Sequence, residues 1–146
     1  MTNKQSSTVP SQIVESNTEI NSVFADTSAL EIAIQDNMKN SSVELYVRSY
    51  FKQYPILVEV ARCESEFRQY NTDGSVLRGR AVRADVGVMQ VNERYHLERS
   101  LQKGMDIYTL RGNLAYAKFL YEEQGLKPWM SSSPCWNKDN MIALAK

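Results

Sequence analysis

The sequence has little of what several classes of protein need. It holds one histidine and two cysteines among 146 residues, and their unrelated spacings exclude a zinc site built from these ligands. Lys and Arg together number 17, and so do Asp and Glu, so no summed positive charge attracts a nucleic acid. We therefore expect no metal, no cofactor and no nucleic-acid partner.

Long apolar runs are also missing. No stretch is apolar for long enough to span a bilayer, and the first residues lack the apolar core of a secretory signal. The sequence thus predicts no membrane span and shows no export signal. Its length is that of one ordinary domain, which can bury a core without a metal or a partner chain, so we expect a monomer.

Composition changes along the chain. Residues 1–40 are rich in Ser, Thr, Asn and Gln and poor in large apolar side chains, which predicts a tail or linker without regular structure. A weak exception is the apolar alternation within 30–34, which fits a short helix or a short strand. We expect the folded domain at 41–137 and a C-terminal tail at 138–146.

Apolar spacing predicts three helices in the folded domain. Ser41 followed by Glu44 is a capping box, and it marks the start of a helix that Pro55 ends. Pro55 also suits the first turn of a second, largely apolar helix. A third helix is expected within 106–124, with Gly125 as its stop.

The segment between the second and third helices has a different character. Asp73 and Gly74 signal a turn, and short β-capable pieces lie on either side of it. We therefore predict an α+β fold, mainly α, with a small β-hairpin lobe beside the helices.

Three acids near that lobe are candidates for chemistry. Glu64 lies in the last turn of the second helix, where partial desolvation favours the protonated form that a general acid needs. A solvated charge at the helix end is the alternative for this residue. Glu66 lies about 200° further round the helix and is expected to face solvent. Asp73 suits a turn, in which its side chain binds the backbone.

Three motifs follow one another along this part of the chain: "E-S-x-F" from Glu64, "G-x-M-Q-x-N" from Gly87 and "N-L-x-x-A" from Asn113. Over roughly residues 43–137 the chain resembles the lytic transglycosylases of the soluble and goose-type lysozyme group. These enzymes cut the β-1,4 bond between N-acetylmuramic acid and N-acetylglucosamine, so the resemblance implies a lysozyme-like fold and peptidoglycan glycan strands as the partner. It also implies that Glu64 is the catalytic acid. The residues that it implies for the substrate cleft are Ser65, Met89, Gln90, Asn92 and Asn113.

Asp85 distinguishes two mechanisms. The pieces "NTDGS" and "D-x-G-x-x-Q-x-N" are also similar to chicken-type lysozymes, in which the Asp of the second piece is the second catalytic carboxylate. A retaining muramidase would use Glu64 as the acid and Asp85 as the nucleophile or cation stabiliser. A lytic transglycosylase uses one Glu as acid and then base, while the C6 hydroxyl of the muramic acid attacks. We favour the transglycosylase, with the muramidase and a non-catalytic glycan-binding module as alternatives.

One motif of that family is missing. Lytic transglycosylases usually end the domain with an Ala-Tyr-Asn-x-Gly motif whose Tyr bonds the catalytic Glu, and here no Tyr follows Tyr121. Another group must orient Glu64, or the mechanism differs. The same absence is what favours the non-catalytic alternative.

Cys63 and Cys135 form an even pair, which is a disulfide in an oxidising compartment or two buried thiols in a reducing one. We favour the disulfide and an extracytoplasmic location. A nucleophilic Cys63 lacks a partner, because nothing places the single histidine, His96, near it.

The remaining candidates have structural interpretations. We expect Trp129 and Trp136 in the core, with stacking on sugars as the alternative, and a structural or solvated position for His96. A basic cluster is expected to be a solvated loop, with the carboxylates of stem peptides as an alternative partner. It consists of Arg78, Arg80 and Arg83.

Overall fold

The fold was obtained as a computed structural model that describes residues 16–138, with side chains for 29–34 and 37–138. Residues 1–15 and 139–146 lie outside the described residues. The beginning of the expected N-terminal tail and most of the expected C-terminal tail therefore fall outside this description.

The chain divides into two compact units, Met1–Asn37 and Met38–Lys146. Helix α1 (Ser16–Tyr50) supplies the described part of the first unit and the beginning of the second. Residues 16–37 are thus helical where the sequence predicted no regular structure. The large apolar side chains described in this part are all exposed, and they are Leu30, Ile32 and Ile34.

The capping box at Ser41 and Glu44 predicted the start of the helix wrongly, because both residues lie inside α1. Between Ser16 and Tyr50 the sequence has neither proline nor glycine, so no residue interrupts the backbone hydrogen bonding of the helix. α1 has 35 residues, yet neither it nor another helix in the described part of the chain is apolar enough to cross a membrane.

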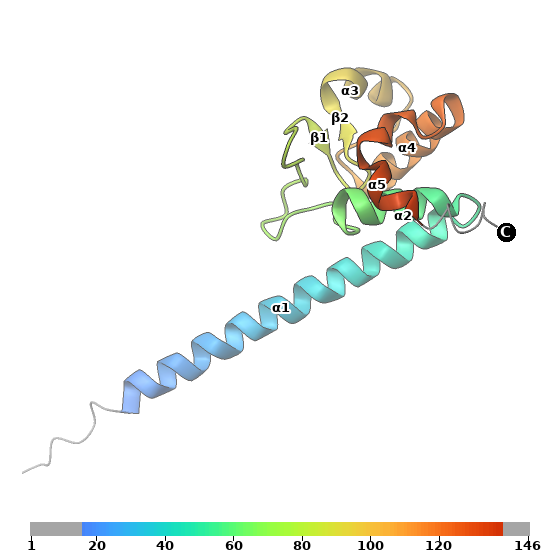
Figure 1. The fold of residues 1–146 in the computed structure, drawn as a ribbon. Coiled ribbons are helices and arrows are strands. Elements are labelled where there is room, and N and C mark those ends of the chain that lie inside the picture. The colour runs from blue at the N-terminus through green and yellow to red at the C-terminus, as the bar shows by residue number, and fades with distance from the viewer. Residues whose placement is uncertain (1–15, 139–146) are drawn as a thin grey trace, which may run out of the picture. The chain divides into compact units, whose positions relative to one another are not determined.

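The second unit is built mainly of helices (Figure 1). After α1, its elements in chain order are α2 (Pro55–Ser65), β1 (Asp85–Val86), β2 (Val91–Asn92), α3 (Glu93–Gln102), α4 (Leu110–Gln124), the 3-10 helix η1 (Lys127–Ser132) and α5 (Ser133–Trp136). α2 packs on η1 and α5, and α4 also packs on η1. The C-terminal helices therefore lie against the helix that carries Glu64.

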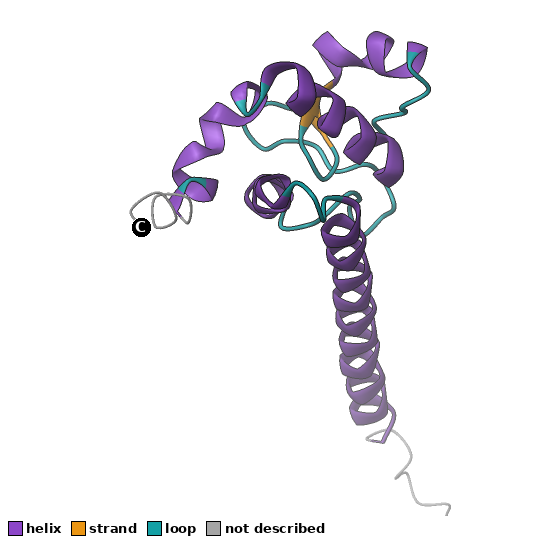
Figure 2. Ribbon diagram, turned by 90° about the vertical axis from the view of Figure 1, so that its right-hand side faces the viewer, coloured by secondary structure: helices purple, strands orange, loops and turns teal. Residues whose placement is uncertain are grey.

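The sheet is small, as Figure 2 shows in orange. β1 and β2 are antiparallel, with Asp85 opposite Asn92 and Val86 opposite Val91. Single bridges, Tyr70 to Val76 and Arg78 to Val86, hold the loop that precedes β1. The predicted α+β, mainly α, class is confirmed at this level.

Local signals predicted α2 and α4 correctly. Pro55 lies in the first turn of α2. α4 ends at Gly125, which has φ 63°, a conformation that glycine adopts at little cost. α4 begins at Leu110 because the Thr109 hydroxyl caps it, accepting a hydrogen bond from the Gly112 N–H at 3.0 Å.

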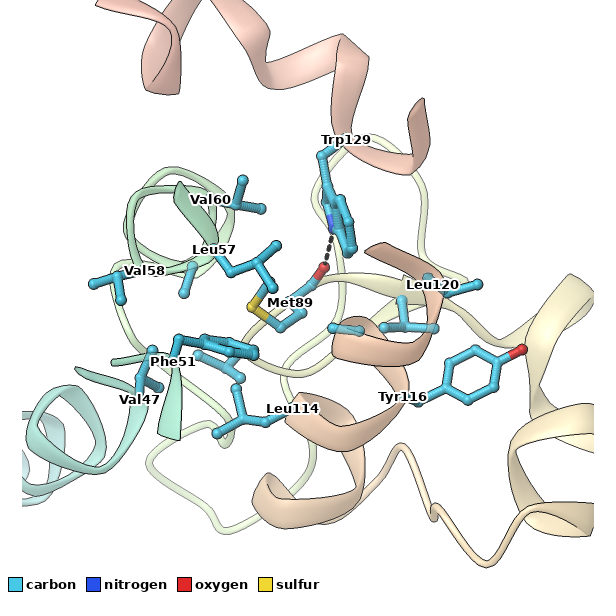
Figure 3. Packing of buried hydrophobic residues seen from close by; sticks show 14 of the residues in the cluster. Val47, Phe51, Leu57, Val58, Val60, Met89, Leu114, Tyr116, Leu120 and Trp129 are labelled. Carbon is cyan, nitrogen blue, oxygen red and sulfur yellow. Dashed lines mark hydrogen bonds between the residues drawn. The ribbon is translucent and has the colours of Figure 1, made fainter. Parts of the chain in front are cut away.

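The core forms where α1, α2, α4 and the loop between the strands meet (Figure 3). Phe51, Leu57, Met89 and Leu114 are all fully buried there. The predicted core positions of both tryptophans are confirmed, since Trp129 is 2% exposed and Trp136 is 4% exposed. The indole N–H of Trp129 donates to the Met89 carbonyl oxygen at 2.9 Å (Figure 3), so η1 is joined directly to the loop between the strands.

Candidate active site

Glu64 lies in the last turn of α2, as predicted, and is half-buried. α2 stops just after it, because Glu66 adopts a left-handed conformation with φ 54°. The pKa of the Glu64 carboxyl is raised, first by burial, and the negative charge of Asp85 raises it further. A hydrogen bond from Ser132 acts in the opposite direction. On balance Glu64 keeps its proton to a higher pH than an ordinary glutamate does.

Ser132 is the group that orients Glu64, and the sequence did not single it out. Its hydroxyl donates to Glu64 Oε1 at 2.5 Å. The Trp136 indole N–H donates to the same hydroxyl oxygen at 3.0 Å, and the Trp129 carbonyl oxygen lies 3.0 Å from it. Ser132 is therefore held by both tryptophans and is itself bonded to the Glu64 carboxyl.

The disulfide explains why Ser132 lies beside Glu64. Cys63 and Cys135 are joined, with a Cα–Cα distance of 6.0 Å and a sequence separation of 72 residues, which confirms the predicted bridge. Cys63 immediately precedes Glu64, and Cys135 comes three residues after Ser132. The pairing of the cysteines was thus the one signal in the sequence that could have pointed to Ser132.

Asp85 begins β1, directly opposite Asn92 in the sheet. The Asn92 side-chain N–H donates to Asp85 Oδ1 at 2.7 Å, and the Asp85 carbonyl oxygen accepts from the Gly79 N–H at 2.8 Å. Asp85 is half-buried, and its charge acts on Glu64. The two predicted carboxyl groups therefore belong to one site, and Asn92 fixes the orientation of the second.

Met89 and Asn113 do not face the cleft, and this corrects the expectation that they bind substrate. Both side chains are 0% exposed. Asn113 Oδ1 accepts from the Met89 N–H at 2.9 Å, while its Nδ2 donates to the carbonyl oxygens of Val86 and Ile107 at 3.0 and 2.8 Å. Asn113 therefore fixes the backbone of the loop between the strands, and the Met89 side chain packs in the core.

Ser65 lines the larger of the two cavities described below, but it is buried and its hydroxyl donates to the Val88 carbonyl oxygen at 2.8 Å. Gln69, which no motif marked, accepts from the Val88 N–H at 2.8 Å. Gly87 permits this close packing, because a Cβ there would lie 2.5 Å from the Asn113 side chain and 2.6 Å from that of Gln69. Ser65 and Gln69 therefore hold the loop against the end of α2.

Two cavities meet at Glu64. One has a volume of about 270 Å³ and the other about 620 Å³. Four residues line both of them: Glu64, Asp85, Gln90 and Ser131. The candidate acid therefore lies on a groove that continues on either side of it. Gln90 reaches this groove with its side chain steadied by the Gly87 carbonyl oxygen at 2.8 Å.

The smaller cavity adds three aromatic side chains that the motifs did not mark as binding residues: Tyr95, His96 and Trp129. Tyr95 is 79% exposed at its edge, and an exposed aromatic ring beside a groove is suited to stacking on a sugar face. His96 lines the same cavity and lies 3.1 Å from the Tyr116 hydroxyl through Nδ1. Burial, with the charge of Arg99, lowers the pKa of His96, so this ring is neutral near pH 7.

The described side chains contain no group of three His, Cys, Asp or Glu residues placed to hold a metal ion. The chain matches no family model, and neither a curated protein nor a solved structure matches it. Only the fold and the site are thus left to define the class of protein. It is a mainly helical α+β protein in which Glu64, half-buried and with a raised pKa, lies on a groove.

Proposed function

We propose that the protein is a peptidoglycan-cleaving glycosidase with a lysozyme-like fold. It cuts the β-1,4 bond between N-acetylmuramic acid and N-acetylglucosamine, acting as a lytic transglycosylase. The observation that carries the proposal is the position of Glu64, a carboxyl with a raised pKa at the junction of two cavities. A groove that extends to both sides of the acid can bind a glycan strand on both sides of the bond that is cut.

In the proposed reaction Glu64 acts first as an acid and then as a base. Its proton passes to the glycosidic oxygen as the bond to C1 breaks, which leaves a carboxylate. Ser132 donates a hydrogen bond to that carboxylate and so stabilises it. Glu64 then takes the proton of the muramyl C6 hydroxyl as this oxygen attacks C1, which closes a 1,6-anhydro ring and restores the acid.

A retaining muramidase is the second candidate, and the placement of Asp85 favours it. Asp85 lines both cavities together with Glu64, and its carboxylate is oriented by Asn92. A carboxylate at this point could stabilise the cationic sugar or attack it, after which water would complete a hydrolysis. In the transglycosylase, Asp85 instead holds the loop and adjusts the pKa of Glu64.

A non-catalytic glycan-binding module is the third candidate. The missing tyrosine motif favoured it because no residue was predicted to orient Glu64, and the hydrogen bond from Ser132 supplies such a residue. The raised pKa of Glu64 also supports catalysis over binding alone, because binding does not need a carboxyl that holds its proton.

We also propose that the protein works outside the cytoplasm, as a monomer. The disulfide is compatible with an oxidising compartment, and peptidoglycan itself lies there.

Purified cell walls test the proposed reaction directly. The full chain should clear them and release fragments that end in 1,6-anhydro sugars, which are one water lighter than hydrolysis products. Asp85→Asn should keep most of the turnover, because the transglycosylase does not use its charge to form a bond. Reducing-end products, together with an inactive Asp85→Asn, would favour the muramidase instead. Intact walls would contradict both enzymes.

A further inference from the structure

The wall of the larger cavity carries three arginines, Arg68, Arg78 and Arg80. Arg78 is already paired, since it forms an ion pair with Glu93 and lies over the Tyr108 ring at 5.9 Å. Arg68 and Arg80 form no ion pair with an acidic side chain anywhere in the described part of the chain. Two guanidinium groups beside Glu64 are therefore left for a ligand.

Arg68 is held close to the end of α2. Its main-chain N–H donates to the Ser65 hydroxyl at 3.1 Å, and its Nε donates to the Ser65 carbonyl oxygen at 3.0 Å. The side chain is half-buried. Because Nε is engaged, the guanidinium has a fixed direction while its terminal nitrogens remain for an acceptor in the cavity.

Arg80 belongs to a tight loop between Gly79 and Asp85. The Gly79 N–H donates to the Asp85 carbonyl oxygen at 2.8 Å, and the Asp85 N–H donates to the Val82 carbonyl oxygen at 3.0 Å. A Cβ at Gly79 would lie only 2.3 Å from that Val82 oxygen, so this turn needs glycine. These hydrogen bonds hold the backbone of the loop that carries Arg80 against Asp85.

The smaller cavity differs in charge. No Lys or Arg lines it, and His96 is neutral near pH 7 because its pKa is lowered. Its distinctive side chain is the exposed ring of Tyr95. Glu64 and Asp85 line both cavities. Beyond them, the groove has an exposed aromatic ring and no Lys or Arg side chain on one side, and on the other it has Glu66 and two guanidinium groups without an ion pair.

We propose that the larger cavity binds the acidic stem peptide that a muramyl residue carries, through Arg68 and Arg80. This inference rests on the proposed function. A guanidinium pairs with a carboxylate through two parallel hydrogen bonds, which gives the contact both strength and direction. A volume of about 620 Å³ is also in the range that takes a ligand larger than one sugar ring. The smaller cavity then receives an uncharged N-acetyl sugar.

The test compares two soluble glycan substrates of matched length. One carries its acidic peptides, and the other has lost them to an amidase, which hydrolyses the amide bond and leaves a free lactyl carboxylate on each muramyl residue. KM is measured at low salt for the full chain, for Arg68→Gln/Arg80→Gln, and for Arg83→Gln. Arg83 is the matched control, because it lies on the same loop and lines neither cavity. Thermal melts establish that all three proteins are folded.

We expect the native protein to have a KM about 5-fold lower for the peptide-bearing strands, the size of effect that two partly exposed ion pairs produce. The ratio should fall towards one in the double variant, persist in Arg83→Gln, and shrink at high salt.

A native ratio of one, or a ratio that the double variant keeps, would overturn this inference alone. Equal losses on both substrates would also overturn it, by showing that the arginines bind a group common to both strands. Failure to cleave either strand would instead overturn the proposed function, and this inference with it.

Discussion

At the scale of single residues, three influences act on the Glu64 proton and they do not agree in direction. Burial and the charge of Asp85 raise the pKa of Glu64, while the hydrogen bond from Ser132 lowers it. The pKa of Glu64 is higher in the folded protein than in the unfolded chain. The protonated carboxyl therefore contributes to the stability of the fold. This contribution is fully present below the unfolded pKa and is lost as the pH rises through the folded pKa. Glu64 therefore weakens the fold at neutral pH, as expected of a residue kept for its chemistry.

Glu64→Gln separates that chemistry from the fold. It keeps the shape of the side chain but removes the transferable proton, so wall cleavage should fall by about 100-fold or more. Its melting temperature should equal or exceed that of the native protein, and the difference should widen from pH 4 to pH 8 as the native carboxyl ionises. Glu59→Gln is the control, since Glu59 lies on the same helix, pairs with Arg62 and lines neither cavity. Near-normal cleavage by Glu64→Gln would rule out its role as the acid.

Ser132→Ala and Asp85→Asn should move the pKa of Glu64 in opposite directions. Loss of the Ser132 hydrogen bond removes an influence that lowers the pKa, so the titration should shift to higher pH. Loss of the Asp85 charge removes an influence that raises it, so the titration should shift to lower pH. NMR titration of the Glu64 carboxyl carbon measures both shifts and does not depend on turnover. Shifts of the same sign would contradict the opposite effects of Ser132 and Asp85 on the pKa of Glu64.

At the scale of elements, the sequence predicted the helices whose starts and ends are marked by residues within or next to them. α2 and α4 were predicted because Pro55 and Gly125 act on their own backbones and the apolar residues between recur at helical spacing. α3 was missed because its residues are mostly polar and its cap, Asn92, had been interpreted as part of a binding motif. The extent of α1 was missed because polar composition indicated a tail, although no residue within it breaks a helix.

The site was predictable only in part, for a related reason. Glu64 and Asp85 could be found because a motif marks them and chemistry needs carboxyl groups. The buried positions of Met89 and Asn113 depend on which side chains pack above them, and motif spacing does not contain that information. Ser132 depends on a contact between residues 68 positions apart, which the disulfide fixes.

The disulfide joins two elements, α2 and α5, and should therefore support both the fold and the site. Closing a loop across 72 residues stabilises the fold by up to about 4 kcal/mol in the chain-entropy model. Reduction should lower the melting temperature by up to about 16 °C, at roughly 4 °C per kcal/mol. It should also lower wall cleavage below the melting temperature, because Ser132 loses the covalent tie that holds it at Glu64.

Cys63→Ser/Cys135→Ser provides the control for that experiment. It should resemble the reduced native protein without any reductant, and adding reductant should change neither its melting temperature nor its cleavage of walls. A native protein whose cleavage survives reduction would show that packing alone keeps Ser132 at Glu64.

At the scale of the whole molecule, the two units differ in what they bury. Every residue of the core cluster lies in the second unit, with Val47 the first fully buried one in the sequence. In the part of the first unit whose side chains are described, the large apolar residues Leu30, Ile32 and Ile34 are exposed, so none of these three is packed in a core. Both cavities of the site are lined by residues of the second unit alone.

Removal of residues 1–37 should therefore leave the second unit stable and active. The shortened chain, Met38–Lys146, keeps the core, the disulfide and the groove. Its melting temperature should stay within about 2 °C of that of the full chain, because a loss of only 1 kcal/mol would lower it by roughly 4–8 °C in a domain of this size. Wall cleavage per molecule should be unchanged under the same conditions. A larger fall in melting temperature would show that the first part of α1 stabilises the fold. A loss of cleavage with an unchanged melting temperature would show that this part of the helix takes part in binding the wall.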